Sequence, residues 1–434
     1  MFFRVAFGLL MAANVVRYEL AGWVDDLYVA PLVRFPYWGF EWLPVFGSAG
    51  MHAMFAVVGL SALAMAAGYR FRLAAATFVV SFSYLELIDR TNYLNHYYLV
   101  SLLALLLVFM PLERGRTRVL SWCVAAIRFQ LTLVYFFAGV AKLRIDWLVG
   151  APLSIWLRRH IDLPLVGSLM DEYWLALAMS WAGLAFDLAV GPCLWFRRTR
   201  PFAYAAVVAF HLATASLFPI GAFPWLMIVS TTVFFAPSWP RDVAKGRFAT
   251  QRTKLRSLVG FRDEGGRSRM SGPSLRAGAV LIGAHFLIQA LFPLRHLLYE
   301  GRTEWHEQGF RFSWNVMVAE KFGMVEFRVV TPDGATSRVH PSDELTPLQM
   351  RMMQTQPDMI LSYAHHLARR WRRQGLGEVA VYADAFANLN GRRRQRFIDP
   401  EVNLAAEEEG FGPKRWILPL QEPDSPVVSA RRTR

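Results

Sequence analysis

Cysteine and charged residues are scarce in this sequence. Its two cysteines, Cys123 and Cys193, both lie inside apolar runs, so they cannot form a disulfide framework and do not report the redox compartment. Cys/His spacing typical of zinc sites is also missing, and we expect no metal. Only 18% of the 434 residues are charged, whereas 54% are hydrophobic. This composition excludes a disordered protein, a coiled coil and an ordinary soluble enzyme, and it indicates a multi-span membrane protein.

Lysine is scarce as well, although the chain is strongly basic. The formal net charge is +14, yet only five of the 47 basic residues are lysines and the other 42 are arginines. Because the basic residues sit between apolar runs, membrane topology explains them better than nucleic-acid binding, and we expect no nucleic-acid partner. Arginine serves wherever a generic positive charge suffices, so each lysine needs a specific reason. The five are Lys142, Lys245, Lys254, Lys321 and Lys414.

Long apolar runs predict a helical membrane bundle of about nine transmembrane helices. A helix needs roughly 20 apolar residues to cross about 30 Å of hydrocarbon. The first run is interpreted as an uncleaved span, because no clear small-residue cleavage site follows it. No internal repeat is evident. The predicted spans are 3–16 (extended by 18–23), 51–68, 73–88, 94–111, 119–142, 174–196, 202–218, 222–237 and 275–293.

The distribution of basic residues predicts the orientation of these spans. With the N-terminus in the cytoplasm, the inner loops carry 17 Lys and Arg and the outer loops carry six. Positively charged loops stay on the cytoplasmic side, so nine spans place the C-terminal region on the outer face. The inner loops are 69–72, 112–118, 197–201 and 238–274, and the outer loops are 17–50, 89–93, 143–173 and 219–221.

The C-terminal part of the chain differs in kind, because alternation and turn residues replace long apolar runs. The predicted elements are a hairpin of residues 325–331 and 335–339 around Pro-Asp-Gly, a helix from about 347 to 373 ending at Gly375, and a strand near 379–382. We therefore predict a transmembrane domain at 1–293, an extracytoplasmic β-rich or α+β domain at 294–421, and a disordered tail at 422–434.

Several ionisable residues fall inside or at the ends of the predicted spans, where they are costly and usually face a bundle interior or a cavity. A lone histidine there is more often a packing residue than a catalyst, a terminal lysine usually snorkels to headgroups, and Asp187 could pair with Arg128. Lys142 is nevertheless the only lysine in the first 244 residues, and lysine, unlike arginine, can lose its proton when desolvated and act as a base. The residues are Glu86, Asp89, His96, Arg128, Lys142, Asp187, His211 and His285.

Short motifs occur in order along the chain. They are Asp89-Arg-Thr with Asn95-His96-Tyr-Tyr-Leu, Tyr135-Phe-Phe-Ala-Gly-Val-Ala-Lys142-Leu-Arg-Ile-Asp146-Trp147, Phe186-Asp187-Leu188, Phe210-His211 with Leu217-Phe-Pro-Ile-Gly-Ala-Phe223, Phe312-Ser-Trp314-Asn-Val-Met317-Val, and Arg396-Phe-Ile-Asp-Pro400. Together they resemble the motifs of the vitamin K-dependent γ-glutamyl carboxylase family, over about residues 5 to 420. The membrane part resembles its horizontally transferred transmembrane (HTTM) domain, and the rest resembles its lumenal β-rich domain.

The resemblance implies an integral membrane enzyme that oxidises reduced vitamin K (phylloquinol or menaquinol) with O₂ to the epoxide. That oxidation yields a strong base, which removes the γ-proton of a protein glutamate so that CO₂ can add. The implied partners are the quinol, a glutamate-containing peptide or protein, and the lipid bilayer.

The resemblance also implies roles for individual residues. Lys142 corresponds to the catalytic base that deprotonates the quinol, and His96 to a histidine that assists carbanion or oxyanion stabilisation. The remaining residues of these motifs are expected to support the site or bind substrate: Asn95, Asp89, Asp187, His211, Trp314, Met317 and Arg396.

The sequence departs from animal members of this family. Ala141 replaces a second lysine, Phe310 and Phe312 replace tyrosines, and the paired cysteines are missing. The arginine-rich composition and shorter chain indicate a bacterial inner-membrane member with a periplasmic C-terminal domain. The alternatives are a quinol oxygenase without carboxylation, a non-catalytic lipid- or quinone-binding scaffold and, with less support because broken repeats are not apparent, a transporter.

Overall fold

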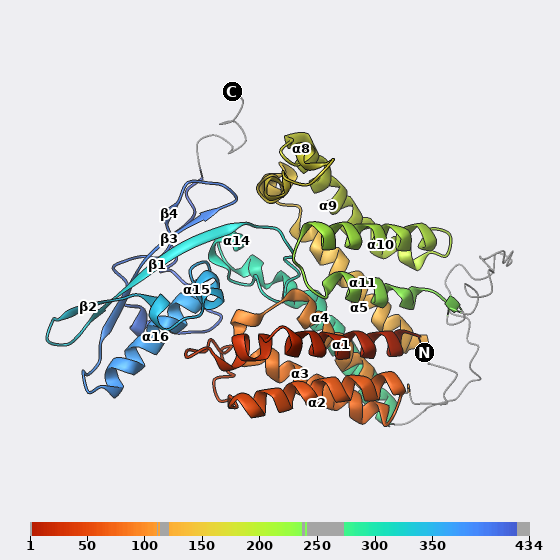
Figure 1. The fold of residues 1–434 in the computed structure, drawn as a ribbon, viewed down its shortest axis with the longest axis horizontal. Coiled ribbons are helices and arrows are strands. Elements are labelled where there is room, and N and C mark those ends of the chain that lie inside the picture. Colours follow the sequence, from red (N-terminus) through yellow and green to blue (C-terminus); the bar gives the residue numbers. More distant parts are fainter. Residues whose placement is uncertain (1, 111, 113–120, 237–238, 241–272, 423–434) are drawn as a thin grey trace.

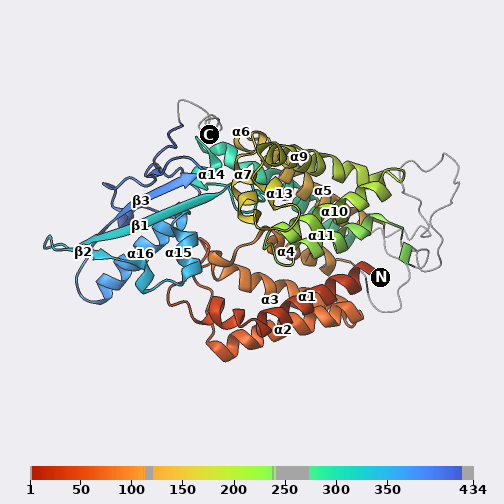
Figure 2. The same ribbon diagram turned by 45° about the horizontal axis from the view of Figure 1, so that its top comes forward.

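The computed structural model describes residues 2–110, 112, 121–236, 239–240 and 273–422. The protein is mostly helical with a small C-terminal sheet, which confirms the coarse prediction of fold class. In Figure 1 the helical bundle and the sheet lie at opposite ends of the molecule, and α1 begins at the end of the bundle far from the sheet. The rotated view of Figure 2 shows the same separation.

Each of the nine predicted spans coincides with a helix, as expected from apolar runs bounded by polar residues. Proline stands in the first turn of several of them, where its missing N–H costs no hydrogen bond. The nine helices are α1 (Phe2–Leu20), α2 (Ser48–Ala67), α3 (Phe71–Leu87), α4 (Asn95–Val108), α5 (Ser121–Ala141), α9 (Tyr173–Trp195), α10 (Arg200–Leu217), α11 (Phe223–Thr231) and α13 (Pro273–Leu291).

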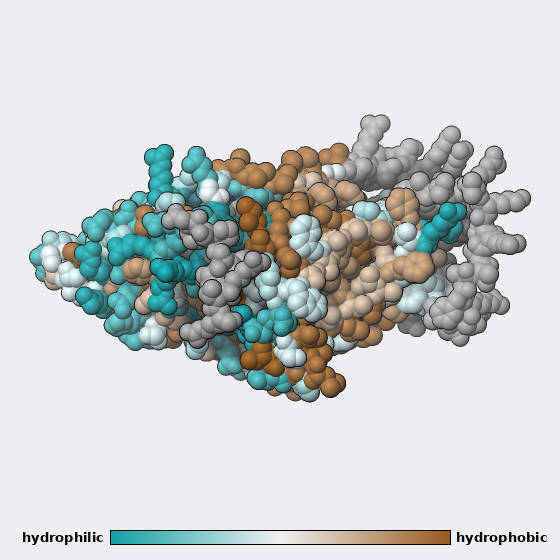
Figure 3. All heavy atoms as spheres, turned by 90° about the horizontal axis from the view of Figure 1, so that it is seen from above, coloured by the Kyte–Doolittle hydropathy of each residue, from teal (hydrophilic) through white to brown (hydrophobic). Residues whose placement is uncertain are grey.

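Four helices in the described part of the chain are long and apolar enough to cross a membrane: α2, α5, α9 and the stretch Val280–Leu298, which joins α13 to the turn η5 (Phe292–Leu298). Figure 3 shows hydrophobic side chains over the helical part and polar side chains gathered over the C-terminal domain. These features define an integral membrane protein. The number of nine spans stays a prediction, because α4 and α11 are shorter and other helices are less apolar.

The outer loop predicted at 143–173 contains helical turns that the sequence did not suggest. They are α6 (Ile145–Leu148), α7 (Ala151–Leu157), η3 (Arg158–His160) and α8 (Gly167–Met170). Trp147, Leu153 and Trp156 from this segment pack with Ala176 and Leu184 of α9 into a small hydrophobic core. The loop is therefore a folded hairpin that extends the bundle on the side of the C-terminal domain.

The C-terminal domain contains an antiparallel sheet in the order β2-β1-β3-β4. The predicted hairpin is confirmed: β1 and β2 pair around a turn that ends at Gly334, whose φ of 86° suits glycine. Both β1 and β3 extend beyond the predicted strands, because they pair with each other along ten residues. The strands are β1 (Lys321–Val330), β2 (Thr336–Val339), β3 (Ala380–Leu389) and β4 (Gln395–Arg396).

The prediction of one helix from 347 to 373 was wrong. The chain forms α15 (Pro347–Met353) and α16 (Pro357–Arg373), separated by residues 354–356, of which Gln356 has an extended backbone (φ −125°, ψ 107°). Residues before proline disfavour the helical region, so Pro357 starts a new helix instead of continuing the first. The apolar face of α16 covers one face of the sheet, where the rings of Tyr363 and Phe327 lie 5.0 Å apart.

Two hydrophobic cores dominate the molecule, one in the bundle and one between the sheet and α16. Trp314, from the C-terminal part of the chain, belongs to the bundle core. Val33 and Phe35, from the segment between α1 and α2, belong instead to the C-terminal core. The two parts therefore interlock, and the domain boundary at 293 stays a prediction. The predicted basic loop 238–274 and the disordered tail 422–434 lie almost entirely outside the described residues.

Close packing of α1 against α2 depends on Gly8. A Cβ atom added there would lie 2.5 Å from the carbonyl oxygen of Ala62 and 2.9 Å from the Cβ of Ala66. We expect Gly8→Ala to separate the helices and cost about 1–3 kcal/mol despite its better helix propensity. Thermal unfolding in detergent measures this loss. Gly283→Ala on α13 is the matched control, because nothing lies within 4 Å of the added atom; equal melting temperatures of both variants would contradict the prediction.

Candidate functional site

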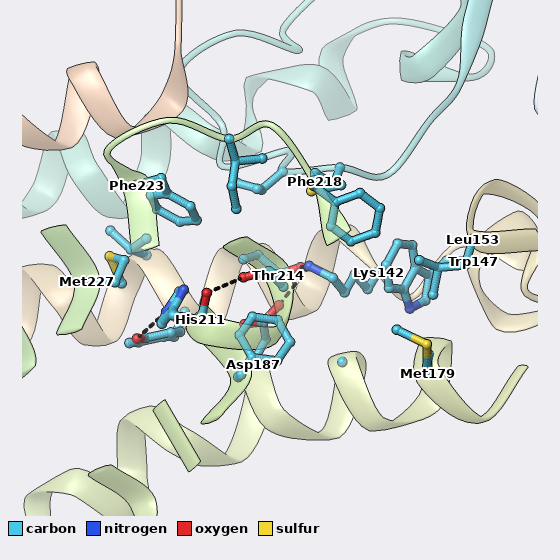
Figure 4. Close-up of a pocket in the computed structure, with 18 of the residues that line it drawn as sticks. Lys142, Trp147, Leu153, Met179, Asp187, His211, Thr214, Phe218, Phe223 and Met227 are labelled. Carbon is cyan, nitrogen blue, oxygen red and sulfur yellow. Dashed lines mark hydrogen bonds and ion pairs between the residues drawn. The ribbon is translucent and has the colours of Figure 1, made fainter. Parts of the chain in front are cut away.

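A cavity lies where α5, α9, α10 and α11 meet the hairpin 143–173 (Figure 4). Its volume is about 100 Å³, several times the roughly 10–15 Å³ that a water molecule needs. Most lining residues are aliphatic, aromatic or methionine, and the polar groups are few. The lining residues include Tyr135, Lys142, Trp147, Asp187, His211, Thr214, Phe218, Phe223 and Met317.

The cavity contains a buried ion pair. Lys142 follows the last residue of α5, and its Nζ donates to Oδ2 of Asp187 on α9 at 2.7 Å and to the carbonyl of Ala138 at 3.3 Å. Both side chains are 6% exposed. Gly139 allows this approach of α5 and α9, since an added Cβ would lie 2.6 Å from a methyl group of Leu188. An uncompensated charge here would be costly, so each partner requires the other.

The alternative pairing of Asp187 with Arg128 is wrong. The Arg128 guanidinium donates instead to the carbonyls of Val233 and Phe234 at the C-terminal end of α11. These carbonyls belong to η4 (Thr232–Phe234), which lacks intrahelical donors for them. Arg128 therefore has a structural role, and the carboxylate of Asp187 belongs to Lys142.

An aromatic ring covers the lysine amine. The Trp147 ring centroid lies 5.1 Å from the Nζ of Lys142, within the range of cation–π contacts. The indole Nε1 donates to the carbonyl of Ser180 at 2.8 Å, which fixes the ring against α9. The amine thus has an aromatic neighbour, a carboxylate and one carbonyl within a largely apolar wall.

His211 contributes a second polar group to the same cavity. Its Nε2 shares a hydrogen bond of 3.2 Å with the hydroxyl of Tyr135. Its Nδ1 is buried and has no partner within the described ranges. Buried polar atoms are usually hydrogen-bonded, so this nitrogen is a natural contact for a polar group of a bound molecule.

The second predicted catalytic residue, His96, does not line the cavity. It lies in the first turn of α4, where its ring packs 5.6 Å from Phe223. The opposite neighbour of Phe223 is His211, at 5.5 Å, so this one phenylalanine separates the two histidines. His96 therefore contacts a lining residue of the cavity but does not line the cavity itself.

Three further predicted residues lie in or beside the linker, which is the segment 299–320 that joins η5 to β1. Met317 lines the cavity. Trp314 is buried and stacks on Tyr98 of α4 at 5.1 Å. Asn95 accepts from the hydroxyl of Tyr93 and donates to the carbonyl of Asn315, so it ties α4 to the linker without reaching the cavity.

Asp89 and Arg396 are not brought to the cavity. Asp89 caps the turn η2 (Arg90–Asn92) by accepting from the Thr91 N–H, and it accepts from Gln349 of α15. Arg396 lies on the sheet with its guanidinium 3.4 Å from Asp384. The prediction that these two residues support the site has no geometrical support here; both make structural contacts.

Glu86 lines a second, smaller cavity of about 20 Å³, which it shares with Tyr18, Tyr28 and Tyr97. Tyr18 and Tyr97 share a hydrogen bond of 2.7 Å there. This space holds about one water molecule and is too small for an organic substrate. His285 shares a hydrogen bond with Gln130.

The linker that carries Met317 has an unusual backbone. Glu307, Phe312, Trp314 and Met317 all have φ between 51° and 61°, in the left-handed region that disfavours non-glycine residues. Strain of this kind persists only where surrounding contacts determine it, and it concentrates at functional sites. The linker is held by Arg144, which donates to Oδ1 of Asn315 at 2.9 Å.

Sequence reasoning missed several members of the site. Tyr135 and Phe223 lie in the quoted motifs but received no role, and Trp147 was assigned to an outer loop. Thr214 was not singled out; its spacing of three residues from His211 on α10 was the available signal, since residues three apart share a helix face. Among the described residues, no group of three or more His, Cys, Asp and Glu could hold a metal ion.

The fold and site thus define an integral membrane protein with a buried lysine–aspartate pair in an apolar cavity beside its C-terminal domain. Residues 1–239 match the HTTM domain. Residues 275–423 match the vitamin K-dependent gamma-carboxylase lumenal domain. The chain therefore belongs to the vitamin K-dependent gamma-carboxylase family and is a carboxylase-like membrane protein. No solved structure matched the chain.

The ion pair predicts a specific pattern of stability. Lys142→Met or Asp187→Leu alone leaves one buried charge unpaired, and we expect each to cost about 3–5 kcal/mol. The double variant Lys142→Met/Asp187→Leu should cost less than either single change, because it buries no unpaired charge. Thermal unfolding of the three variants in detergent measures this coupling; additive losses would show that the two side chains do not interact.

Proposed function

We propose that this protein oxidises a quinol with O₂ to the epoxide and couples the oxidation to γ-carboxylation of a peptide glutamate. The observation that carries the proposal is the amine of Lys142, 5% exposed in an apolar cavity and paired with Asp187. Membership of the carboxylase family supports the same activity. The substrate is a lipid-soluble quinol, for which menaquinol and phylloquinol are the natural classes.

The proposed reaction balances in atoms and electrons, and it requires one proton acceptor in the cavity. Quinol and O₂ give the epoxide and water, while the glutamate γ-carbon loses a proton and gains CO₂ as a carboxylate. Lys142 accepts the first proton, from a quinol hydroxyl, which yields a quinolate that O₂ can attack. In the competent state the single proton of the pair resides on Asp187, so Lys142 is a neutral amine beside a neutral carboxyl group. The proton taken from the quinol then makes Lys142 an ammonium and gives the pair a net positive charge beside the quinolate.

The remaining groups of the cavity fit this reaction. The unpartnered Nδ1 of His211 can bind the second oxygen of the quinol, and Tyr135 orients the imidazole from its other side. The apolar and aromatic wall excludes water, which would otherwise protonate a carbanion. His96, behind Phe223, is assigned to the glutamate half of the reaction.

The proposal includes a topology. Nine helices cross a bacterial inner membrane, the N-terminus is cytoplasmic and the C-terminal domain is periplasmic. The positive charge of the loops opposite this domain supports the assignment. A peptide glutamate would then reach the cavity from the outer side, where the linker and Met317 form part of the wall.

The alternative is a quinol oxygenase without carboxylation. The position of His96 favours it, because Phe223 separates this histidine from the cavity that contains Lys142 and His211. The residue proposed as the base for quinol oxidation therefore lines the cavity, whereas the residue proposed for carbanion chemistry does not. Only incorporation of CO₂ into a peptide distinguishes the two activities.

Purified protein in detergent, supplied with vitamin K hydroquinone and O₂, should form the epoxide, and Lys142→Ala should abolish this activity. Lys142→Arg should also be inactive, because a guanidinium keeps the positive charge but cannot accept a proton. Lys414→Ala, a lysine of the C-terminal domain outside the cavity, is the control and should keep full activity. Epoxide formation by the Lys142→Arg protein would identify Asp187 as the base instead, and no epoxide from the wild type would exclude the proposed oxidation.

Carboxylation is tested with the same preparation, labelled bicarbonate and a short glutamate peptide. We expect label in the peptide with the wild-type protein, and His96→Ala should reduce the label far more than the epoxide, because it acts after quinol oxidation. Phe223→Ala should leave epoxide formation measurable, as a control for damage to the shared wall. Epoxide without any label in the peptide would establish the quinol oxygenase instead.

A further inference from the structure

A chain of charged side chains connects the segment after Lys142 to the C-terminal domain. The carboxylate of Asp146 accepts from both terminal nitrogens of Arg392, at 2.6 and 2.8 Å, and from Asn390 at 2.7 Å. Arg302 approaches the same carboxylate at 2.9 Å. Four charge-assisted contacts thus converge on one side chain that is 4% exposed.

Two further contacts hold the same segment at Arg144, two residues before Asp146. Arg144 donates to Oδ1 of Asn315 in the strained linker and forms an ion pair of 3.2 Å with Glu304. Glu304 also lies 3.7 Å from Arg302, so positive and negative groups alternate without a gap. We refer to this run as the interdomain clamp; it consists of Arg144, Glu304, Arg302, Asp146 and Arg392.

The clamp remains charged under physiological conditions. Burial alone would raise the pKa of Asp146, but hydrogen bonds from Arg392 and Asn390 outweigh it and hold the pKa at about 2. Since this pKa lies below its ordinary value, the stabilisation is present at neutral pH and is lost only as the pH falls through about 2. Buried ion pairs add little net stability compared with apolar contacts. The role of the clamp therefore lies in the position that it gives to α6.

The residue next to Asp146 in α6 contacts the amine of Lys142. Trp147 follows Asp146 in α6, and its ring covers the Nζ of Lys142 at 5.1 Å. With four residues, α6 is a single turn, too short to hold its shape without tertiary contacts. Figure 4 shows Trp147 beside Lys142 on one side of the cavity. The ring is held from two sides: its Nε1 bonds to Ser180 of α9, and its backbone follows Asp146, which the clamp holds.

We infer that the interdomain clamp is a positioning device, through which the C-terminal domain holds Trp147 over Lys142 and shields the amine from water. Asp146 and Arg392 are positioning residues, since neither lines the cavity. The C-terminal domain, on the side from which the proposed peptide glutamate arrives, then also determines the surroundings of Lys142 in the bundle. The consequence for quinol oxidation rests on the proposed function, whereas the shielding itself can be measured without turnover.

The test measures how fast an amine-reactive acylating reagent labels each lysine of the detergent-purified, full-length protein, read by mass spectrometry. Lys142 should react slowly in the wild type. Asp146→Asn and Arg392→Gln, which cut the clamp from either side, should each raise its labelling rate about tenfold or more, because a segment that loses its tertiary contacts opens locally more often and exposes the amine. Lys321, buried in the C-terminal domain, should stay slow in both variants and reports that this domain remains folded.

Asp358→Asn is the matched control. Asp358 joins Arg90, between α3 and α4, to Arg311 of the linker, so it also forms an ion pair between the two parts of the molecule. This variant should leave the labelling of Lys142 unchanged, because the Asp358 carboxylate pairs with Arg90 and Arg311 and with no residue of α6. An equal rise in all three variants, a rise at Lys321, or no rise at Lys142 would overturn the inference.

Turnover separates a failure of this inference from a failure of the proposed function. If the wild type oxidises quinol, the two clamp variants should lower kcat about tenfold and leave KM within about twofold, because Trp147 is the one lining residue that moves and the rest of the cavity wall is unchanged. Asp146→Glu, which keeps the carboxylate, should restore part of kcat. A wild type without quinol oxidation would reject the proposed function, while the labelling rates would still decide whether the clamp shields Lys142.

Discussion

The buried pair of Lys142 and Asp187 is the contact on which the rest of the site depends. Neither charge could remain in an apolar bundle alone, so the pair requires α5 and α9 to approach closely, and Gly139 permits this approach. The 2.7 Å contact also holds the amine of Lys142 inside a largely apolar wall, where the proposed function needs a proton acceptor. A polar group of this kind is retained in a membrane protein chiefly where it acts.

The C-terminal domain is part of this arrangement and not merely attached to it. Its linker supplies Met317 to the cavity and adopts four left-handed backbone conformations at non-glycine residues, which only dense contacts can maintain. Arg144, just before α6, binds the linker, and Asp146, within α6, binds the β3–β4 turn. The bundle and the C-terminal domain therefore meet beside Lys142, which under the proposed function is a physical reason for one chain to carry both.

Much of this could be predicted from the sequence, and the failures have physical causes. Apolar runs located the helices, and scarcity together with position drew attention to Lys142, because a generic charge in this chain is arginine. Asp187 was located by its motif, but its partner was not, since pairing between helices depends on packing. Asp89 and Arg396 lie away from the cavity, as a turn cap and in an ion pair on the sheet, so their supporting role stays a prediction. The break before Pro357 was a local signal, although the helical pattern on both sides obscured it.

The central claim is that Lys142 removes a proton from the quinol. The most direct measurement is the absorbance spectrum of vitamin K hydroquinone bound to the purified protein without O₂, which separates the neutral quinol from its anion. The account predicts bound quinolate with the wild-type protein and bound neutral quinol with Lys142→Met. Neutral quinol on the wild type, or quinolate on both proteins, would contradict it.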